Sequence, residues 1–306
     1  MRRANRAVTG YLPPMTFNDD VRSSGRVERR GRGGMVAGGV GGLGLVGIVL
    51  FLLTGNSGFL GLDGGGGGGG GAPQPAQTME CTGAMANQDV NCRMELSGDA
   101  LDQYWNAELS RQANIQYQMP GFVTFEQATN TACGQASSAV GPFYCPPDAT
   151  VYLDTNFFQV LETQLGAQNA PLAQIYIVAH EWGHHIQNQT GAMERADRRN
   201  TGPLSDGVRL ELQADCYAGM FVGEAATVVD PDVGTTFLEP PTRQQVQDAL
   251  DAAAAVGDDH IQAQSGQVTN PESWTHGSSE SRMNWFVTGY ENGSMQACDT
   301  FATDNL

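Results

Sequence analysis

The sequence predicts an α+β protein in which helices dominate and a small sheet comes early, preceded by one transmembrane helix. Three observations carry this prediction. An apolar segment at 35–53 contains no charged residue. Strand-like runs lie at 122–125 and 150–153, and segments with helical periodicity continue to about residue 290.

The composition excludes one large class of functions. The chain has 33 acidic and 16 basic side chains, all of the latter arginine, and a formal net charge of −17. A nucleic-acid-binding protein needs a dense cationic surface to meet the phosphate backbone, so we expect no nucleic-acid partner. The hydrophobic fraction of 40% is sufficient for a packed core, which argues against global disorder.

The first 78 residues divide into three segments of different composition. Residues 1–34 form a basic tail, in which eight arginines stand against three acidic residues. Residues 35–53 are apolar, and a helix of that length spans roughly 28 Å, about the thickness of a bilayer core. Residues 54–78 include eight consecutive glycines and two prolines, a composition typical of a flexible tether.

The order of these segments predicts a single-pass protein of the cell membrane. By the positive-inside rule, the arginine-rich tail stays in the cytoplasm and the acidic remainder is exported. A cleaved secretory signal peptide is the alternative, because it too begins basic and continues apolar. The long leading segment and the length of the apolar run favour an uncleaved anchor. We therefore expect residues 79–306 to form an extracytoplasmic domain.

Six cysteines all follow the tether, which agrees with an oxidising location. Their even number predicts disulfides, although six cysteines allow fifteen pairings. A zinc knuckle is the alternative, but no CxxC spacing occurs, and for Cys216 a buried free thiol is another. Proximity along the chain favours the pairs Cys81–Cys92 and Cys133–Cys145, which leaves Cys216–Cys298.

Capping residues and breaks delimit the elements of this domain. Ser97 suits the N-cap of an amphipathic helix. Pro171 suits the first turn of a long helix, and Gly191 suits its C-terminal cap. The helices expected on this basis span residues 97–113, 156–165, 171–189, 207–227, 243–256 and 279–290.

The strongest functional signal is the run His180-Glu181-Trp182-Gly183-His184 inside the helix expected at 171–189. Histidines four residues apart lie on one face of a helix, so both imidazoles can reach a single tetrahedral metal ion. Glu181 is close enough to that face to take a proton from a metal-bound water. Two ordinary helix histidines are the alternative, which is costly if both are buried.

Zinc with two histidine ligands needs a third protein ligand and an open position for water. Glu211 and Asp215 lie four apart on the next predicted helix. We expect Glu211 to bind the metal and Asp215 to accept the second N–H of a ligating histidine. The HExxHxxGxxH pattern fails, because Gln187 and Thr190 stand where glycine and histidine are needed. A solvated surface glutamate is the alternative for Glu211.

His276 is a further candidate, because it precedes the last predicted helix, which carries Arg282. A histidine or arginine brought to a zinc site can stabilise the oxyanion that forms as water adds to a carbonyl. A capping or core histidine is the alternative.

These motifs resemble the neutral zinc metallopeptidases of bacteria, a membrane-anchored, YpfJ-like family. The resemblance implies a zincin-like fold, assigns His180, His184 and Glu211 to Zn²⁺, and makes Glu181 the catalytic acid and base. It also implies that His276 lies near the site. The motifs that carry it are Arg29-Arg30-Gly31, Gly141-Pro142-Phe143-Tyr144-Cys145-Pro146, Val151-Tyr152-Leu153-Asp154, the HEWGHHIQ run from His180, the ELQADCYAG run from Glu211, and His276-Gly277-Ser278-Ser279.

The sequence therefore predicts a membrane-anchored zinc metallopeptidase that hydrolyses peptide bonds with zinc-activated water and Glu181 as general base. Its expected partners are the membrane and a peptide or protein substrate. The alternative is a catalytically silent, zinc-stabilised extracytoplasmic binding module, which a fourth protein ligand at the metal would favour. A zinc hydrolase acting on a non-peptide amide would use the same residues.

Overall fold

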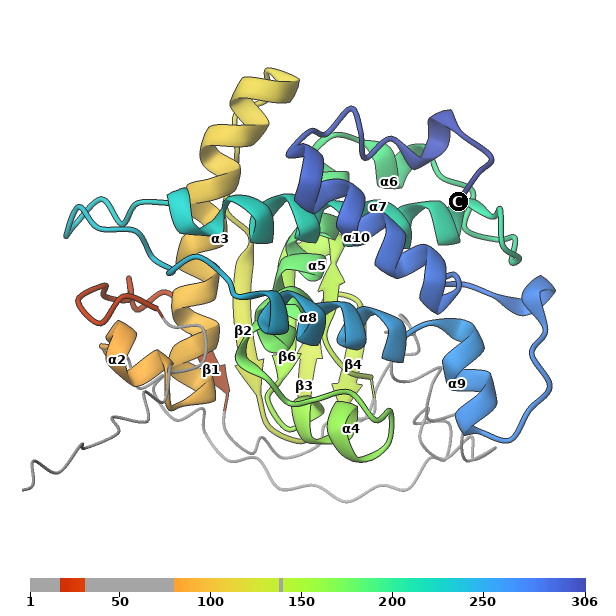
Figure 1. Cartoon of the computed structure of the whole chain (residues 1–306), viewed down its shortest axis with the longest axis horizontal. Coiled ribbons are helices and arrows are strands. Elements are labelled where there is room, and N and C mark those ends of the chain that lie inside the picture. The colour runs from red at the N-terminus through yellow and green to blue at the C-terminus, as the bar shows by residue number, and fades with distance from the viewer. Residues whose placement is uncertain (1–16, 31–79, 138–139) are drawn as a thin grey trace, which may run out of the picture.

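The structure, a computed structural model, describes residues 17–30, 80–137 and 140–306 (Figure 1). The helices are α2 (Gly83–Ala86), α3 (Val90–Ala113), α4 (Phe157–Thr163), α5 (Pro171–Gln189), α6 (Ala192–Arg195), α7 (Asp206–Glu224), α8 (Arg243–Ala255), α9 (Asp258–Gln264) and α10 (Ser279–Asn292). The strands are β1 (Glu28–Arg30), β2 (Gly121–Phe125), β3 (Ala128–Thr131), β4 (Gly134–Ser137), β5 (Phe143–Cys145) and β6 (Thr150–Asp154).

A four-stranded sheet in the order β1-β2-β6-β5 forms one layer. Strands β1, β2 and β6 run parallel, with Val123 opposite Tyr152, whereas the edge strand β5 is antiparallel to β6. All five residues of β6 are buried, as expected for a central strand covered on both faces. A separate antiparallel pair, β3 and β4, stands beside this sheet.

Helix α5 is the central element, because it contacts the sheet through β5 and β6 and also packs against α3, α7 and α8. Every residue from Leu172 to Gln187 is buried, which is the pattern of a helix enclosed on all sides. The bounds agree with the helix that the sequence predicts at 171–189.

A close approach between α5 and α7 depends on Gly183. A Cβ atom built there would lie 2.9 Å from the Cα of Ala214 on α7, so only glycine allows this spacing. The crossing of α7 and α10 is closer still, since a Cβ at Gly289 would lie 1.8 Å from the carbonyl oxygen of Cys216. Both contacts bring α7 against the centre of the molecule.

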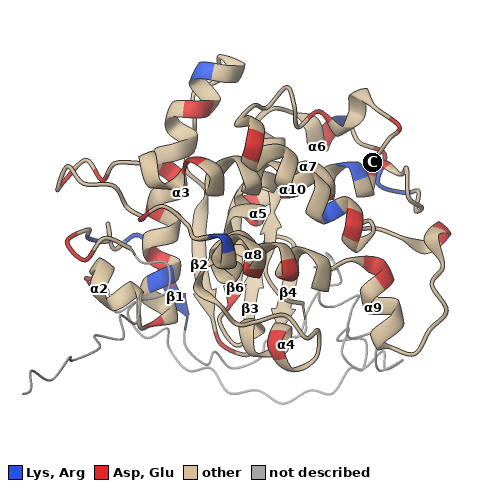
Figure 2. Ribbon diagram, viewed as in Figure 1, with Lys and Arg blue, Asp and Glu red and all other residues tan. Residues whose placement is uncertain are grey.

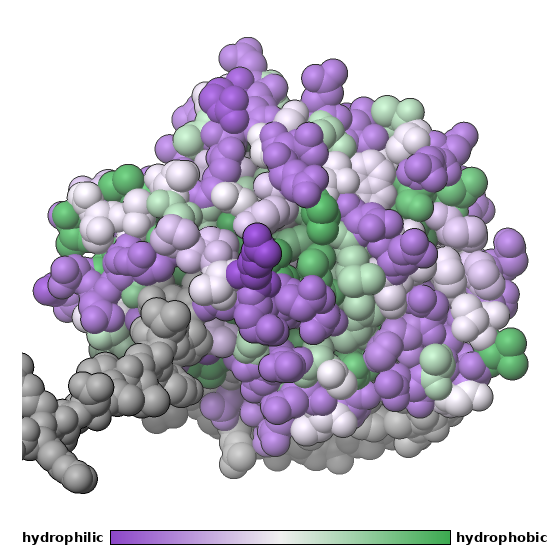
Figure 3. All heavy atoms as spheres, in the orientation of Figure 1, coloured by the Kyte–Doolittle hydropathy of each residue, from purple (hydrophilic) through white to green (hydrophobic). Residues whose placement is uncertain are grey.

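The charges and hydropathy agree with a folded, acidic body. Acidic residues are spread over most of the elements in Figure 2, and basic residues are fewer, as the net charge of −17 requires. The face drawn in Figure 3 is mostly hydrophilic. The largest buried side chains are Trp105, Trp182, Arg282, Tyr176, Phe125, Phe157, Phe158, Phe221 and Phe286.

The three predicted disulfides are confirmed. One joins the segment before α3 to its first turn, a second links the β3–β4 turn to β5, and the third ties α7 to the C-terminal segment. These are Cys81–Cys92, Cys133–Cys145 and Cys216–Cys298.

Residues 17–30, which we call the N-terminal arm, fold onto the rest of the chain. Phe17 and Val21 are buried. The arm ends in β1, which pairs with β2 at the edge of the sheet. Residues 17–30 therefore belong to the same folded body as residues 80–306.

The prediction of a single-pass membrane protein is wrong. The expected transmembrane helix at 35–53 and the tether at 54–78 lie outside the described residues, and no helix in the described ranges is long and apolar enough to cross a membrane. The N-terminal arm also packs against residues 80–306, whereas one crossing at 35–53 would put the two on opposite sides. The fold class is therefore corrected to a mixed helix and sheet body, in which no helix of the described ranges spans a membrane. The predicted membrane localisation and membrane partner are corrected with it.

Candidate active site

Two helices bring together the three residues predicted to bind metal. His180 and His184 lie on α5 and Glu211 on α7, and one ligand atom from each lies within 4.8 Å of the others. The Nε2 atom of His180 is 3.2 Å from Oε2 of Glu211, and the Nε2 atom of His184 is 3.5 Å from its Oε1. The two imidazoles and the carboxylate therefore converge on one point.

A hydrogen bond at Nδ1 fixes the orientation of each histidine ring. The Nδ1 atom of His180 donates to Oδ1 of Asp215 at 2.8 Å, and that of His184 donates to Oε1 of Gln187 at 2.9 Å. Both acceptors are oxygens without a proton, so each Nδ1 carries a hydrogen, and Nε2 is the nitrogen that faces the point of convergence and could bind a metal once it is deprotonated.

Gln187 is a site residue that the sequence analysis missed, having treated it only as a mismatch to another motif. Its amide nitrogen donates to the carbonyl oxygen of Leu210 at 2.6 Å, which fixes its oxygen toward His184. Its position three residues after His184, on a neighbouring part of the same helix face, is the signal that could have indicated this role.

Asp215 anchors His180 within a buried network that also contains Tyr176 and Arg282. It accepts hydrogen bonds from the hydroxyl of Tyr176 at 2.6 Å and from Nε of Arg282 at 2.8 Å. Burial raises the pKa of Asp215, but Arg282 and His180 together hold that pKa below its ordinary value. Arg282 therefore neutralises the carboxylate behind His180, and this pairing across three helices was not predicted.

The electrostatics of the three converging groups suit a cation. Burial alone would lower the pKa of His180, but the carboxylate of Asp215 outweighs it and raises that pKa to about 9. Burial likewise raises the pKa of Glu211, but His184 and His180 hold it well below the ordinary value. Glu211 is thus ionised at neutral pH, and positive charge is favoured beside it.

Glu181, the predicted base, is buried next to this centre. Burial raises the pKa of its carboxyl group, and the neighbouring imidazoles of His184 and His180 only partly offset that increase. A raised pKa makes a carboxylate a stronger base, which suits a group that takes and returns a proton.

His276 is buried on the loop before α10 and is held there by Asp258, the first residue of α9. One carboxylate oxygen of Asp258 accepts the backbone N–H groups of Thr275, His276 and Gly277 at 2.8, 2.7 and 3.0 Å. The other lies 3.2 Å from Nδ1 of His276. His276 is near enough to Glu211 to contribute to lowering its pKa.

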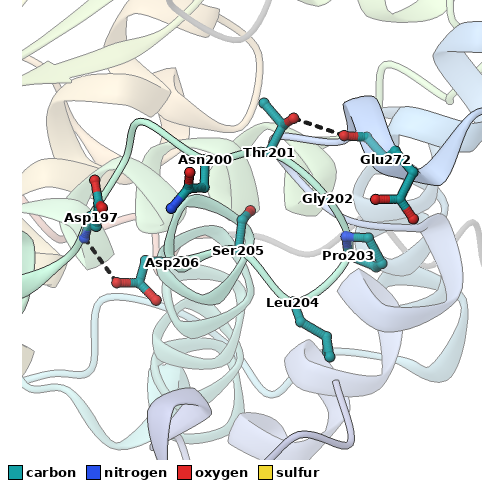
Figure 4. Close-up of a pocket in the computed structure, with 9 residues that line it drawn as sticks. All are labelled: Asp197, Asn200, Thr201, Gly202, Pro203, Leu204, Ser205, Asp206 and Glu272. Atoms are coloured by element: carbon teal, nitrogen blue, oxygen red, sulfur yellow. Dashed lines mark hydrogen bonds between the residues drawn. The ribbon is translucent and has the colours of Figure 1, made fainter.

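A surface pocket at the start of α7 is separate from this centre (Figure 4). The loop before α7 supplies most of its lining, and Glu272 approaches from the other side, where its carbonyl oxygen accepts the hydroxyl of Thr201 at 2.7 Å. None of the three converging residues lines it.

The donor set fits zinc. Two imidazole nitrogens and one carboxylate oxygen form a ligand combination found in catalytic zinc sites, which keep a fourth position open. Among the described residues, the group comprises these three side chains and no further histidine, cysteine, aspartate or glutamate. The geometry therefore resembles a catalytic site more than a closed structural one.

Comparison with known proteins points to the same chemistry. Residues 15–301 match the family described as "Putative neutral zinc metallopeptidase". An uncharacterized protein of Mycobacterium tuberculosis (strain H37Rv) is 49% identical over 225 residues, which are 74% of this chain and 75% of that protein. The uncharacterized protein YpfJ of Escherichia coli K12 is 37% identical over 204 residues, 64% of this chain and 66% of its own. No solved structure matches the chain.

The family match spans almost the whole chain, from the N-terminal arm to the segment after α10, and includes every residue of the converging site. The chain belongs to the family of neutral zinc metallopeptidases.

Proposed function

We propose that this protein is a zinc-dependent peptidase that hydrolyses peptide bonds in a peptide or protein substrate. The observation that carries the proposal is the convergence of His180, His184 and Glu211 beside the buried carboxyl group of Glu181. The family to which the chain belongs supports a zinc peptidase in general terms. The roles of individual residues rest on the geometry.

His180, His184 and Glu211 would hold Zn²⁺, which when bound polarises a carbonyl group and lowers the pKa of water. Glu181 takes a proton from the attacking water and later returns it to the leaving amine. Asp215 and Gln187 keep both histidine rings turned toward the point where the metal would bind.

His276 is proposed to stabilise the oxygen of the reacting carbonyl group. Asp258 is placed to accept from its Nδ1 and also fixes the loop that carries it. A ring that donates from Nδ1 to Asp258 can donate from Nε2 to a substrate oxygen only as the doubly protonated imidazolium, so the proposed role requires that form. The alternative of a silent, zinc-stabilised binding module would be favoured by a fourth protein ligand, and the described residues supply three.

The proposal is tested with the full chain on a mixed peptide library read by mass spectrometry. We expect cleavage by the zinc-loaded protein, loss of cleavage after chelation, and its return when zinc is added back. The matched control is Glu181→Gln, which keeps the shape of the side chain and should bind zinc without cleaving. Cleavage that survives in Glu181→Gln would refute the role of this residue, and a zinc-loaded wild type that cleaves no peptide would favour the binding module.

A further inference from the structure

The N-terminal arm is bound to the rest of the chain by an interface with many specific contacts. Figure 1 shows the arm, drawn in red, beside α3. At its start, Phe17 bridges to Leu238 and the side chain of Asn18 donates to the carbonyl oxygen of Thr236 at 2.6 Å. At its end, β1 extends the sheet. Its middle part crosses a row of acidic residues on α3.

This row consists of Glu95, Asp99 and Asp102, which are four and three residues apart and so lie on one face of α3. All three are buried. A buried carboxylate is costly unless a cation or hydrogen-bond donor meets it. The cations that meet this row come from the arm.

The arm places at least one donor group or cation at each carboxylate. Arg29 pairs with Glu95 at 2.7 Å. The backbone N–H and hydroxyl of Ser24 donate to Asp99 at 2.8 and 2.6 Å. Arg26 forms an ion pair with Asp102 and lies 3.6 Å from Asp99. The three buried carboxylates of α3 therefore have these hydrogen-bond donors and cations only when the arm is docked.

From Arg26 the contacts continue to α5. Its guanidinium carbon lies 5.6 Å from the centroid of the Trp182 ring, within the range of a cation–π contact. The indole N–H of Trp182 donates to Asp102 at 3.1 Å, and the hydroxyl of Tyr117 donates to the same oxygen at 2.6 Å. Arg26 and Asp102 thus hold Trp182 from two directions.

Trp182 stands two residues from each of the proposed zinc ligands on α5. A separation of two residues is about 200° around a helix, so Trp182 points away from the face that carries His180 and His184. A group that holds Trp182 consequently fixes the rotation of α5 about its axis, and with it the direction of both imidazoles.

We propose that Arg26 is a positioning residue for the zinc site, and that docking of the N-terminal arm is required for the site to hold zinc and to work at full rate. This inference rests on the proposed function for its effect on catalysis, but its effect on zinc binding is independent of peptidase activity. The arm is then part of the catalytic unit, acting on α5 through Asp102 and Trp182.

The test compares Arg26→Gln with Arg22→Gln in the full chain. Arg22 is a matched control on the same arm, because its side chain makes an exposed ion pair with Glu80. The readouts are zinc affinity by chelator competition, kcat and KM for a cleaved peptide, and thermal unfolding. For Arg26→Gln we expect zinc affinity to fall about tenfold, as for other residues that orient metal ligands, and kcat to fall with KM little changed. Arg22→Gln should match the wild type.

A rescue experiment separates positioning from general loss of stability. Adding Asp102→Asn to Arg26→Gln removes the buried unpaired charge and keeps an oxygen for the indole N–H of Trp182. We expect the zinc affinity of the double variant to lie within about threefold of the wild-type value. Its affinity should therefore be clearly higher than that of Arg26→Gln alone, which is expected to be about tenfold below the wild type. If Arg26→Gln unfolds at a lower temperature but binds zinc and turns over as the wild type does, the arm is only structural and the proposal is refuted.

If Arg26→Gln does not fold, Arg26→Lys replaces it, because lysine keeps the charge beside Asp102 but lacks the planar guanidinium that lies over the Trp182 ring. We then expect a loss of zinc affinity of about threefold, smaller than for removal of an orienting residue. Wild-type zinc affinity in Arg26→Lys would overturn the proposal. Because zinc affinity is measured without substrate, a wild type that binds zinc but cleaves nothing would count against the proposed function alone.

Discussion

The two histidines of the proposed zinc site differ in what holds them. His180 is backed by the carboxylate of Asp215 and, behind it, by the guanidinium of Arg282, whereas His184 is backed by the neutral amide of Gln187. A carboxylate partner makes an imidazole more basic than an amide partner does. In the proposed site, a carboxylate therefore makes His180 the more basic ligand, whereas a neutral amide only orients His184.

The amide of Gln187 should be needed for tight zinc binding. Gln187→Leu removes the acceptor for Nδ1 of His184 while keeping a buried side chain of similar volume. We expect zinc affinity to fall by about 10- to 100-fold, because the ring is then free to turn. The measurement is chelator competition, with Gln189→Leu as the control on the same helix, since Gln189 bonds His185 and Gln118 instead. Equal affinities in the two variants would contradict the assigned role.

The charge on His180 gives a pH dependence to the metal-free protein. Burial opposes protonation, but Asp215 raises the pKa of His180 to about 9, above the ordinary value of 6.5. The protonated form therefore stabilises the fold; this contribution is complete below about pH 6.5 and is lost as the pH rises through about 9.

The melting temperature of the chelator-treated protein should accordingly fall between pH 6.5 and 9. Zinc binds the neutral imidazole, so the zinc-loaded protein should lose this dependence. Thermal unfolding across the range, with His180→Gln as a variant that cannot titrate, measures both. A metal-free protein whose melting temperature rises with pH would contradict the pairing of His180 with Asp215.

Much of the candidate site could be predicted at the residue scale, because the spacing within a helix decides which side chains share a face. His180, His184, Glu211 and Asp215 follow from that rule, and the structure brings the four together. Tyr176 and Arg282 do not follow from it. The hydroxyl of Tyr176 and the guanidinium of Arg282 both reach Asp215 from other helices, and such contacts depend on how the helices pack.

At the scale of elements, the approach of α5 to α7 decides whether Glu211 can meet the histidines. Gly183→Ala places a methyl group 2.9 Å from the backbone of Ala214, so the two helices must move apart. We expect a loss of about 1–3 kcal/mol of unfolding free energy and weaker zinc binding, because Glu211 moves with α7.

The control for this prediction is Gly207→Ala in the first turn of α7. A Cβ there meets nothing nearer than 3.6 Å, and alanine favours a helix more than glycine does. Urea unfolding and chelator competition on both variants make the comparison. If Gly183→Ala bound zinc as tightly as Gly207→Ala, the tight crossing would not be what positions Glu211.

The first residue of a helix could be predicted from the sequence for α5 but not for α3. Pro171 correctly predicted the start of α5. The backbone N–H at the first helical position has no partner within the helix, so proline, which lacks it, loses no hydrogen bond there. The start of α3 differs: the helix begins at Val90 with Asp89 as its cap, and Ser97, the expected cap, lies within it. The hydroxyl of Ser97 donates to the carbonyl oxygen of Arg93, which a serine inside a helix can do as readily as it caps one.

At the scale of the whole molecule, the disulfides should stabilise the fold unequally. The Cys216–Cys298 bond closes a separation of 82 residues, and Cys81–Cys92 closes one of 11. By loop-closure entropy, their removal should cost about 4–5 and about 3 kcal/mol respectively. Urea unfolding of paired Cys→Ser variants measures both values. A larger loss for the short loop would contradict this ranking.

The composition of the N-terminal arm led to the wrong prediction of a membrane topology signal. Arginines ahead of an apolar run are typical of a topology signal, and nothing local distinguishes that use from ion pairing within a domain. Arg29 meets Glu95 across 66 residues of chain. An ion pair between segments so far apart in the sequence can be seen only in the folded structure. The structure therefore corrects the predicted topology, and it shows that arginines of this segment form ion pairs within the folded body.

In the proposed function, three protein ligands hold a zinc ion and one position stays open. The X-ray absorption spectrum at the zinc edge tests it most directly, on the full chain loaded with one equivalent of metal. We expect two imidazole nitrogens, a carboxylate oxygen from Glu211 and a water molecule that an added peptide hydroxamate displaces. Four protein ligands with no exchangeable position would contradict it, and would identify the zinc as structural.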